Sequence, residues 1–206
     1  ELSDEVIRLA PSLNGVEGGL ELVIGYGSNM GTSRGFAQTI EADARRRYGS
    51  ALSRVVISPL DEVLSSGALV SSEPDATSVL VVVTSSYNGE PPDNARDFVA
   101  WLSEASPESA GLGSWYTAVF GCGNTQWGHR FQAVPKKVAH ELERLGVSAI
   151  CERGAGDDDT SLDMDFEAWY TLFVPALDMA YGVEAVPLVS AAGADDIESG
   201  DELPAL

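Results

Sequence analysis

Small and hydroxyl-bearing residues are concentrated in one turn, Gly25-Tyr26-Gly27-Ser28-Asn29-Met30-Gly31-Thr32, which directly follows the apolar run 22–24. Apolar side chains then recur at the spacing of a helix face: Phe36, Ala37, Ile40 and Ala44. A strand that leads into a helix in this way leaves backbone N–H groups unpaired at the helix N-terminus, where they can hold a phosphate. Because Ser28 and Thr32 add hydroxyl donors and no lysine follows, the turn predicts a site for a single phosphate group.

The spacing of this turn differs from two common nucleotide-binding motifs. It lacks the lysine of the P-loop, and Met30 stands where the last glycine of Gly-x-Gly-x-x-Gly would be. A nucleoside triphosphate or a dinucleotide is therefore disfavoured. The alternative interpretation is a strand-to-helix connection in which the glycines serve only to tighten the turn.

Two later loops carry aromatic, amide and glycine residues. The loop 84–94 contains Ser86, Tyr87, Asn88 and Gly89. The loop 120–127 contains Cys122, Gly123, Asn124, Thr125 and Trp127. A flat ring held between Tyr87 and Trp127 would gain burial and about 0.5–1.5 kcal/mol of stacking per aromatic pair.

The elements that must position these loops alternate between strand and helix. Strands are predicted at about 20–24, 51–57, 78–84, 115–120 and 148–150. Helices are predicted from the end of the first turn to a C-cap at Gly49, from a cap at Asp93 through 102, at 136–145, and from a cap at Asp163 or Asp165 through 177, kinked near Pro175. An irregular acidic connection is expected at 59–62 and a turn at 154–156. Such alternation predicts an α/β fold with an open parallel sheet of five strands covered by helices on both faces. The three loops would then meet at the carboxyl edge of the sheet.

Length and composition predict one domain with an acidic surface. The chain has 206 residues and a formal net charge of −20, which disfavours binding to nucleic acid or anionic membranes and favours a basic protein partner. We expect a linker or arm at 1–19, the domain at 20–182, and an acidic linker at 183–206. The missing initiator Met suggests a piece of a longer protein. Without a long apolar run or a signal peptide, and with two unpaired cysteines, a cytoplasmic location is expected, and no metal site.

Three motifs together resemble one family. They are Tyr-Gly-Ser-Asn-Met-Gly-Thr at 26–32, Ser-Tyr-Asn-Gly at 86–89 with Pro-Pro-Asp-Asn-Ala at 91–95, and Phe-Gly-Cys-Gly at 120–123 with Trp127. In order and spacing, they resemble the FMN-binding, flavodoxin-like domain of diflavin reductases, most of all the bacterial type fused to a cytochrome P-450 that hydroxylates fatty acids. The resemblance covers about residues 20–181 and implies the strand order 2-1-3-4-5.

The resemblance also implies site residues. The 5′-phosphate would be held by Ser28, Asn29, Met30, Gly31 and Thr32. Tyr87 and Trp127 would flank the isoalloxazine ring, and the backbone of Asn88 and Gly89 would lie near its N5 and O4. Gly123, Asn124 and Thr125 would line the pyrimidine end, and Phe131 and Gln132 would close the pocket. Ser86 and Cys122 would also belong to the FMN-binding site. Two of these positions depart from the family pattern, since Asn124 stands where an Asp is usual and Phe131 where a Tyr is usual. No catalytic side chain is implied.

By the same resemblance, FMN would take electrons from an NADPH-reduced FAD domain and pass them singly to a cytochrome P-450 haem domain, both in the same polypeptide. FAD, NADPH and haem would thus belong to the parent protein, which could form a homodimer. The alternatives are a stand-alone flavodoxin, a free-standing FMN quinone reductase, or a phosphate-binding module without a redox role.

Two features bear on the electrostatics of such a site. The acidic residues Asp157, Asp158, Asp159, Asp163, Asp165 and Glu167 follow the last predicted strand. They either form a solvated loop at a helix N-terminus or steer basic partners. An acidic rim would disfavour an anionic reduced flavin and lower its potential, whereas an amide N–H from the loop 86–91 would stabilise the anionic one-electron form.

Overall fold

The computed structural model describes residues 19–73 and 75–183. Its strands are β1 (Leu20–Gly27), β2 (Leu52–Pro59), β3 (Thr77–Ser85), β4 (Tyr116–Gly123), β5 (Ser148–Ala149) and β6 (Gly154–Asp157). Its α-helices are α1 (Thr32–Tyr48), α2 (Leu60–Ser65), α3 (Arg96–Glu104), α4 (Pro107–Ala110), α5 (Ala133–Arg144) and α6 (Leu162–Ala180), and the 3-10 helices are η1 (Gly49–Ala51) and η2 (Thr125–Arg130). The predicted linkers 1–19 and 183–206 lie outside the described residues, except for Gly19 and Val183.

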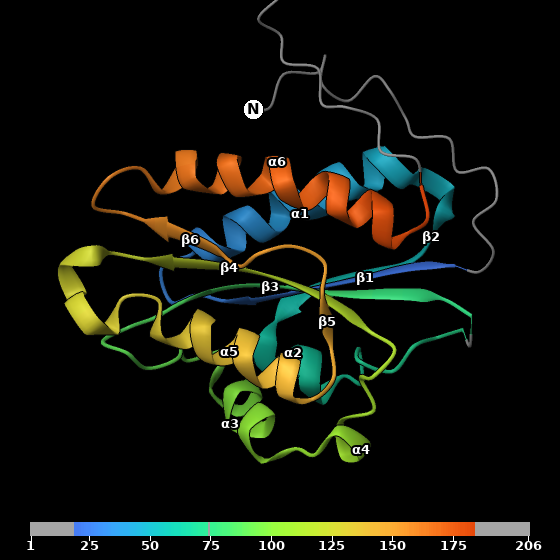
Figure 1. The fold of residues 1–206 in the computed structure, drawn as a ribbon, viewed down its shortest axis with the longest axis horizontal. Helices are drawn as coiled ribbons and strands as arrows, with labels where there is room; N and C mark the ends of the chain where they lie inside the picture. Colours follow the sequence, from blue (N-terminus) through green and yellow to red (C-terminus); the bar gives the residue numbers. More distant parts are fainter. Residues whose placement is uncertain (1–18, 74, 184–206) are drawn as a thin grey trace, which may run out of the picture.

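The strands form one parallel sheet with the order β2-β1-β3-β4-β5, which confirms the predicted fold class and strand order. Helices α1 and α6 cover one face, while α2, α3 and α5 cover the other (Figure 1). The central strand β3 serves both faces: Val79, Val81 and Val83 belong to the core under α1 and α6, and Leu80 and Val82 to the opposite core. This explains the continuous apolar run of that strand.

The fifth position of the sheet is shared by two short strands. Both β5 and β6 pair with β4, β5 at Tyr116 and Thr117 and β6 along 120–123. The prediction of a turn at 154–156 was therefore wrong. A Cβ at Gly154 would lie 2.4 Å from the Phe120 ring, so this glycine permits close packing against β4 and does not form a turn.

Three local predictions also differ from the structure. The connection after β2 is the helix α2, whose Leu60 and Val63 are buried, because apolar residues at this spacing find a core to pack against. Helix α6 is capped by Ser161, whose hydroxyl accepts from the Met164 N–H, instead of by Asp163 or Asp165. Helix α3 begins at Arg96, three residues beyond the predicted cap.

Two buried carboxylates lie near the edge of the sheet at which the strands begin, opposite to the edge that carries the loops. Asp178 is fully buried and accepts from Arg47 Nε at 2.8 Å and from the Tyr48 hydroxyl at 2.8 Å. Glu21 is also buried, and accepts hydrogen bonds from Ser72 and Ser78 next to Arg54. Burial raises the pKa of Glu21, but these hydrogen bonds and the Arg54 charge outweigh it, so the net pKa lies below its usual value.

In the part of the chain that the structure describes, no helix is long and apolar enough to cross a membrane. The same residues contain no group of three or more His, Cys, Asp or Glu side chains arranged to hold a metal ion.

Candidate functional site

The strand register brings four loops together at the carboxyl edge of the sheet. Gly27 at the end of β1 pairs with Thr84 of β3. Ser85 then pairs with Cys122 of β4, and Gly123 pairs with Asp157 of β6. The loops that follow these four strands therefore start side by side, as the sequence predicted for the first three.

The loop 28–32, here called the phosphate loop, leads into an open helix N-terminus. Gly31 is the N-cap of α1, with φ at 95°, and no side chain caps the helix. A Cβ at Gly31 would have nothing within 4 Å, and Met30 is 82 % exposed. Because the first N–H groups of a helix need partners from outside it, this arrangement fits a phosphate group.

Hydrogen bonds hold the phosphate loop in shape. Within the loop, the Gly31 N–H donates to Ser28 Oγ at 2.8 Å. Two bonds then cross to the segment before α3: the Ser28 N–H donates to Asn94 Oδ1, and the Asp93 N–H donates to Asn29 Oδ1, each at 2.9 Å. Ser28 thus shapes the loop from within, and the segment 93–94, in the loop between β3 and α3, supports it through its bonds to Ser28 and Asn29.

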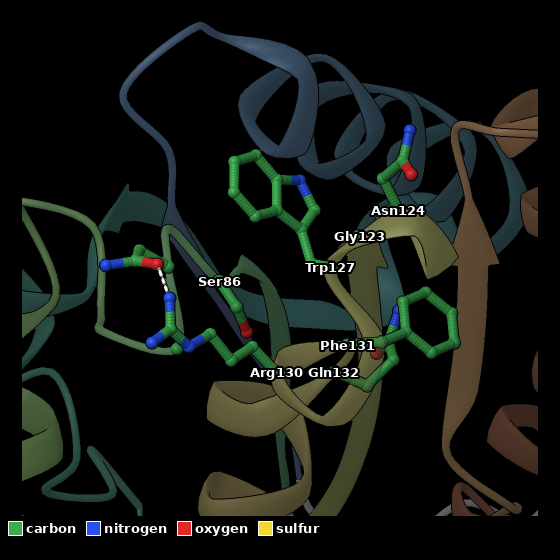
Figure 2. A pocket seen from close by; sticks show the side chains of 9 residues that line it. Ser86, Gly123, Asn124, Trp127, Arg130, Phe131 and Gln132 are labelled. Carbon is green, nitrogen blue, oxygen red and sulfur yellow. Dashed lines mark hydrogen bonds between the residues drawn. The ribbon is translucent and has the colours of Figure 1, made fainter.

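A pocket lies between the loops after β3 and β4 (Figure 2). It is lined by Ser86, Asn88, Gly89, Gly123, Asn124, Trp127, Arg130, Phe131 and Gln132. Figure 2 shows the indole of Trp127 standing clear of the other lining side chains, and the residue is 58 % exposed. An exposed tryptophan beside an open pocket offers a flat surface on which a ring can stack.

Eight of the predicted site residues line this pocket. The others are the residues 28–32, Tyr87, Cys122 and Thr125. The phosphate loop, 28–32, is a separate part of the same edge. Tyr87 is half-buried and pairs with Glu90 through two backbone hydrogen bonds of 2.9 Å. Thr125 is exposed and directed to β6, since its N–H and hydroxyl both donate to the Asp157 carboxylate, at 2.9 and 2.7 Å.

Cys122 lies beneath the site, in the core. Its thiol accepts a hydrogen bond from the Ser33 hydroxyl at 3.5 Å, which links β4 to the first turn of α1. Burial raises the pKa of the Cys122 thiol to about 11, so the thiol is neutral at physiological pH.

Gln132 has a bracing position that the sequence did not indicate. The side chain is 1 % exposed, and its amide donates to the carbonyls of Gly121 at 2.9 Å and Gly156 at 3.0 Å. Its oxygen accepts from Arg153 at 3.0 Å. Gln132 therefore joins β4 to β6, although φ is 60°, a left-handed conformation that is costly for a residue other than glycine.

The two departures from the family pattern have local explanations. Asn124 is the N-cap of η2, and its oxygen accepts from the Gln126 N–H at 2.8 Å, a task that an amide performs as well as a carboxylate. The Phe131 ring packs on Gly123, where an added Cβ would lie 3.0 Å from it. This contact is apolar and does not require a phenolic hydroxyl.

Two residues of the acidic run, Asp157 and Asp165, accept hydrogen bonds near the pocket. Desolvation raises the pKa of Asp157, but the hydrogen bonds from Thr125 and Asp159 outweigh it and lower the pKa below its usual value. Asp165 accepts from the Asp157 N–H at 2.8 Å. The Asp165 carboxylate thus joins the two ends of the loop after β6, and the Asp157 carboxylate ties this loop to Thr125. Asp158 and Asp163 are exposed.

Arg130 is the pocket residue that sequence reasoning missed. Its guanidinium donates to Asn88 Oδ1, across 42 positions of sequence (Figure 2). Nothing in the local pattern of η2 indicates this contact. The signal that could have found it is the presence of a cation within a glycine-rich loop of a strongly acidic chain.

Comparisons with known proteins place these features in a family. The flavodoxin family model matches residues 24–169. The chain is 39 % identical over 169 residues to NADPH–cytochrome P450 reductase of Homo sapiens, covering 81 % of this chain and 24 % of that protein. It is 36 % identical over 155 residues to bifunctional cytochrome P450/NADPH–P450 reductase 2 of Bacillus subtilis, covering 75 % and 14 %. The chain thus spans about a quarter or less of the length of these relatives.

Solved structures with the same fold include a cysteine-to-alanine mutant of flavodoxin from Pseudomonas aeruginosa, with a TM-score of 0.56 and 21 % identity, covering 79 % of this chain and 99 % of that one. The flavodoxin of Streptococcus pneumonia TIGR4 gives a TM-score of 0.55 and 22 % identity, covering 79 % and 95 %. At this identity the likeness concerns the fold alone. The family model and the identity to the reductases together show that this chain belongs to the flavodoxin family, whose domains bind FMN.

Proposed function

We propose that this chain carries electrons on one FMN, from an NADPH-reduced FAD domain to the haem of a cytochrome P450. The observation that carries the proposal is the open N-terminus of α1 at the same edge of the sheet as the pocket beside Trp127. The former suits the phosphate of FMN, and the latter suits its ring.

The relatives support the choice of partners. Two are named for both NADPH and cytochrome P450, and one of them, the bifunctional protein, combines the two activities in one chain. Because this chain matches only a small part of each, the sites for FAD, NADPH and haem would lie in other domains. We propose that these domains belong to the same polypeptide.

Each part of the site would have a distinct task. Bound FMN supplies the chemistry, since a flavin accepts two electrons together and releases them one at a time. The phosphate loop would anchor the cofactor without a lysine. Trp127 would cover one face of the ring, with Tyr87 on the other. The backbone of Asn88 and Gly89 would meet the ring near N5 and O4, while Gly123, Asn124 and Thr125 line its pyrimidine end.

A binding comparison tests the anchoring. Riboflavin lacks the phosphate but keeps the ring. If two charge-assisted hydrogen bonds of about 1.5 kcal/mol each are lost, riboflavin should bind at least about a hundredfold more weakly than FMN. Quenching of flavin fluorescence on titration into the apo-protein measures both affinities. Equal affinities, or no binding of FMN, would contradict the proposal, and the latter would favour a module without a redox role.

A variant separates the phosphate loop from the ring pocket. Ser28→Ala removes the acceptor that holds the Gly31 N–H and should weaken FMN by roughly tenfold, with little effect on riboflavin. The control is Ser103→Ala on α3, whose hydroxyl bonds to a carbonyl within its own helix. This variant should bind FMN as the wild type does.

Electron delivery is tested by mixing the dithionite-reduced, FMN-loaded chain with cytochrome c, a basic acceptor, in a stopped-flow instrument. If exposed acids such as Asp158 and Asp163 steer the partner, the rate should fall steeply with salt, over a Debye length of about 8–10 Å. Double replacement by Asn should flatten this dependence, whereas Glu104→Gln on α3 should not. A rate independent of salt would remove steering from the proposal.

Fusion is tested in the gene. The reading frame upstream of Glu1 should encode a haem domain with a cysteine-ligated motif, and the downstream frame an FAD- and NADPH-binding domain. A compact open frame with neither domain would instead favour a stand-alone flavodoxin or a quinone reductase.

A further inference from the structure

The loop after β3 contains a tight turn at Asn88 and Gly89. Both residues have positive φ, 55° and 88°. The flanking residues, Tyr87 and Glu90, exchange two backbone hydrogen bonds of 2.9 Å. Two residues with positive φ between such a pair are typical of a type I′ turn, for which Asn-Gly is the preferred sequence. This turn borders the pocket.

Arg130 covers the turn from the loop after β4. Its aliphatic stem lies over Gly89, where an added Cβ would meet Arg130 Cγ at 3.5 Å and its Cβ and Cδ at 3.8 Å. Its guanidinium donates to Asn88 Oδ1, as the dashed line in Figure 2 shows. The stem and the head of Arg130 thus contact consecutive residues of the turn, which fixes where its charge lies.

That charge is unbalanced within the pocket. Of the nine lining residues, the other eight are neutral. In the described ranges, 19–73 and 75–183, no carboxylate lies within 4.0 Å of the Arg130 guanidinium, although six other arginines have such partners. A cation without a counter-ion beside a ligand favours the more negatively charged form of that ligand.

We propose that Arg130, held in place by Asn88, tunes this site in favour of reduced, anionic FMN over oxidised FMN. The inference rests on the proposed binding of FMN in this pocket. An acidic rim alone was expected to disfavour an anionic reduced flavin. Arg130 would oppose this effect, because a cation in the pocket acts on the flavin at shorter range than carboxylates outside the pocket. Arg130 is thus a positioning and electrostatic residue and exchanges no electrons itself.

The test measures the affinities of the chain for oxidised and for reduced FMN, the latter under anaerobic conditions, and takes their ratio. Coulomb attraction across about 12 Å at an effective dielectric constant near 20 corresponds to roughly a tenfold change in this ratio, and a shorter separation to a larger change. Arg130→Gln, which keeps a donor for Asn88 but loses the charge, should shift the ratio about tenfold toward oxidised FMN. Arg130→Lys, which keeps the charge, should retain most of the wild-type ratio.

Two further variants complete the design. Asn88→Gly frees the guanidinium, keeps the positive φ of the turn, and should shift the ratio in the same direction as Arg130→Gln, but less. Arg45→Gln removes an equal charge from the far end of α1, where Arg45 pairs with Glu41, and should leave the ratio unchanged.

The outcomes are distinguishable. If the wild type binds neither form of FMN, the proposed function fails and with it the basis of this inference. If the wild type binds both forms and Arg130→Gln gives the same ratio as Arg45→Gln, the tuning role is wrong while the proposed function stands. A shift in Arg130→Lys as large as that in Arg130→Gln would also overturn the electrostatic role.

Discussion

We expect Gln132→Ala to destabilise the fold more than it weakens FMN binding, although Gln132 lines the pocket. The side chain makes two neutral hydrogen bonds to the carbonyls of Gly121 and Gly156 and one charge-assisted bond with Arg153. At about 1 kcal/mol for each neutral bond and about 1.5 kcal/mol for the charged one, the free energy of unfolding should fall by roughly 3.5 kcal/mol.

The assay is urea unfolding of the apo-protein, followed by tryptophan fluorescence. Gln132→Met keeps the volume of the side chain and loses its hydrogen bonds, so it should lose most of the same free energy, about 3.5 kcal/mol. Gln38→Ala, at an exposed position of α1, should change the free energy by less than about 0.5 kcal/mol. If Gln132→Met were as stable as the wild type, the bracing hydrogen bonds would contribute nothing net and the reasoning would fail.

Three further predictions concern buried and half-buried groups. Asp178→Asn leaves the Arg47 charge without its partner and should cost about 3–5 kcal/mol of unfolding free energy, measured by urea unfolding. The lowered pKa of Glu21 means that its contribution to stability is complete above the unfolded value, near 4.3, and is lost as pH falls through the folded value. Urea unfolding of Glu21→Gln should therefore show a shallower loss of stability in acid. Because burial raises the pKa of both Cys122 and Cys151 to about 11, iodoacetamide at pH 8 should label neither until the chain is unfolded, as mass spectrometry would show.

The features that depend on local pattern could be predicted from the sequence. The apolar run of β3 and the helix spacing after Thr32 define their elements without knowledge of the partners. The phosphate loop is local too, since a glycine N-cap and the following helix turn are contiguous in the chain. The order of the strands came from resemblance, because alternation alone does not fix which strand lies at the edge.

What could not be predicted depends on contacts between distant segments. The guanidinium of Arg130 reaches Asn88, and the carboxylate of Asp157 holds Thr125, across 42 and 32 positions. Neither pairing leaves a periodic trace in the sequence. The turn predicted at Gly154 was wrong for a related reason. The sequence does not distinguish a glycine that is needed for close packing against a ring from a glycine that is needed in a turn.

One contact far from the pocket bears on how this unit could be used within larger proteins. The Tyr181 hydroxyl, just after α6, donates to the Glu21 carbonyl near the start of β1 at 3.1 Å. The described part of the chain therefore begins and ends at neighbouring points, at the edge of the sheet opposite to the loops that follow β1, β3, β4 and β6. Units with adjacent entry and exit points can be inserted into other chains with little disturbance. If this unit were inserted into another chain through these points, the opposite edge of its sheet, which carries the loops, would stay accessible.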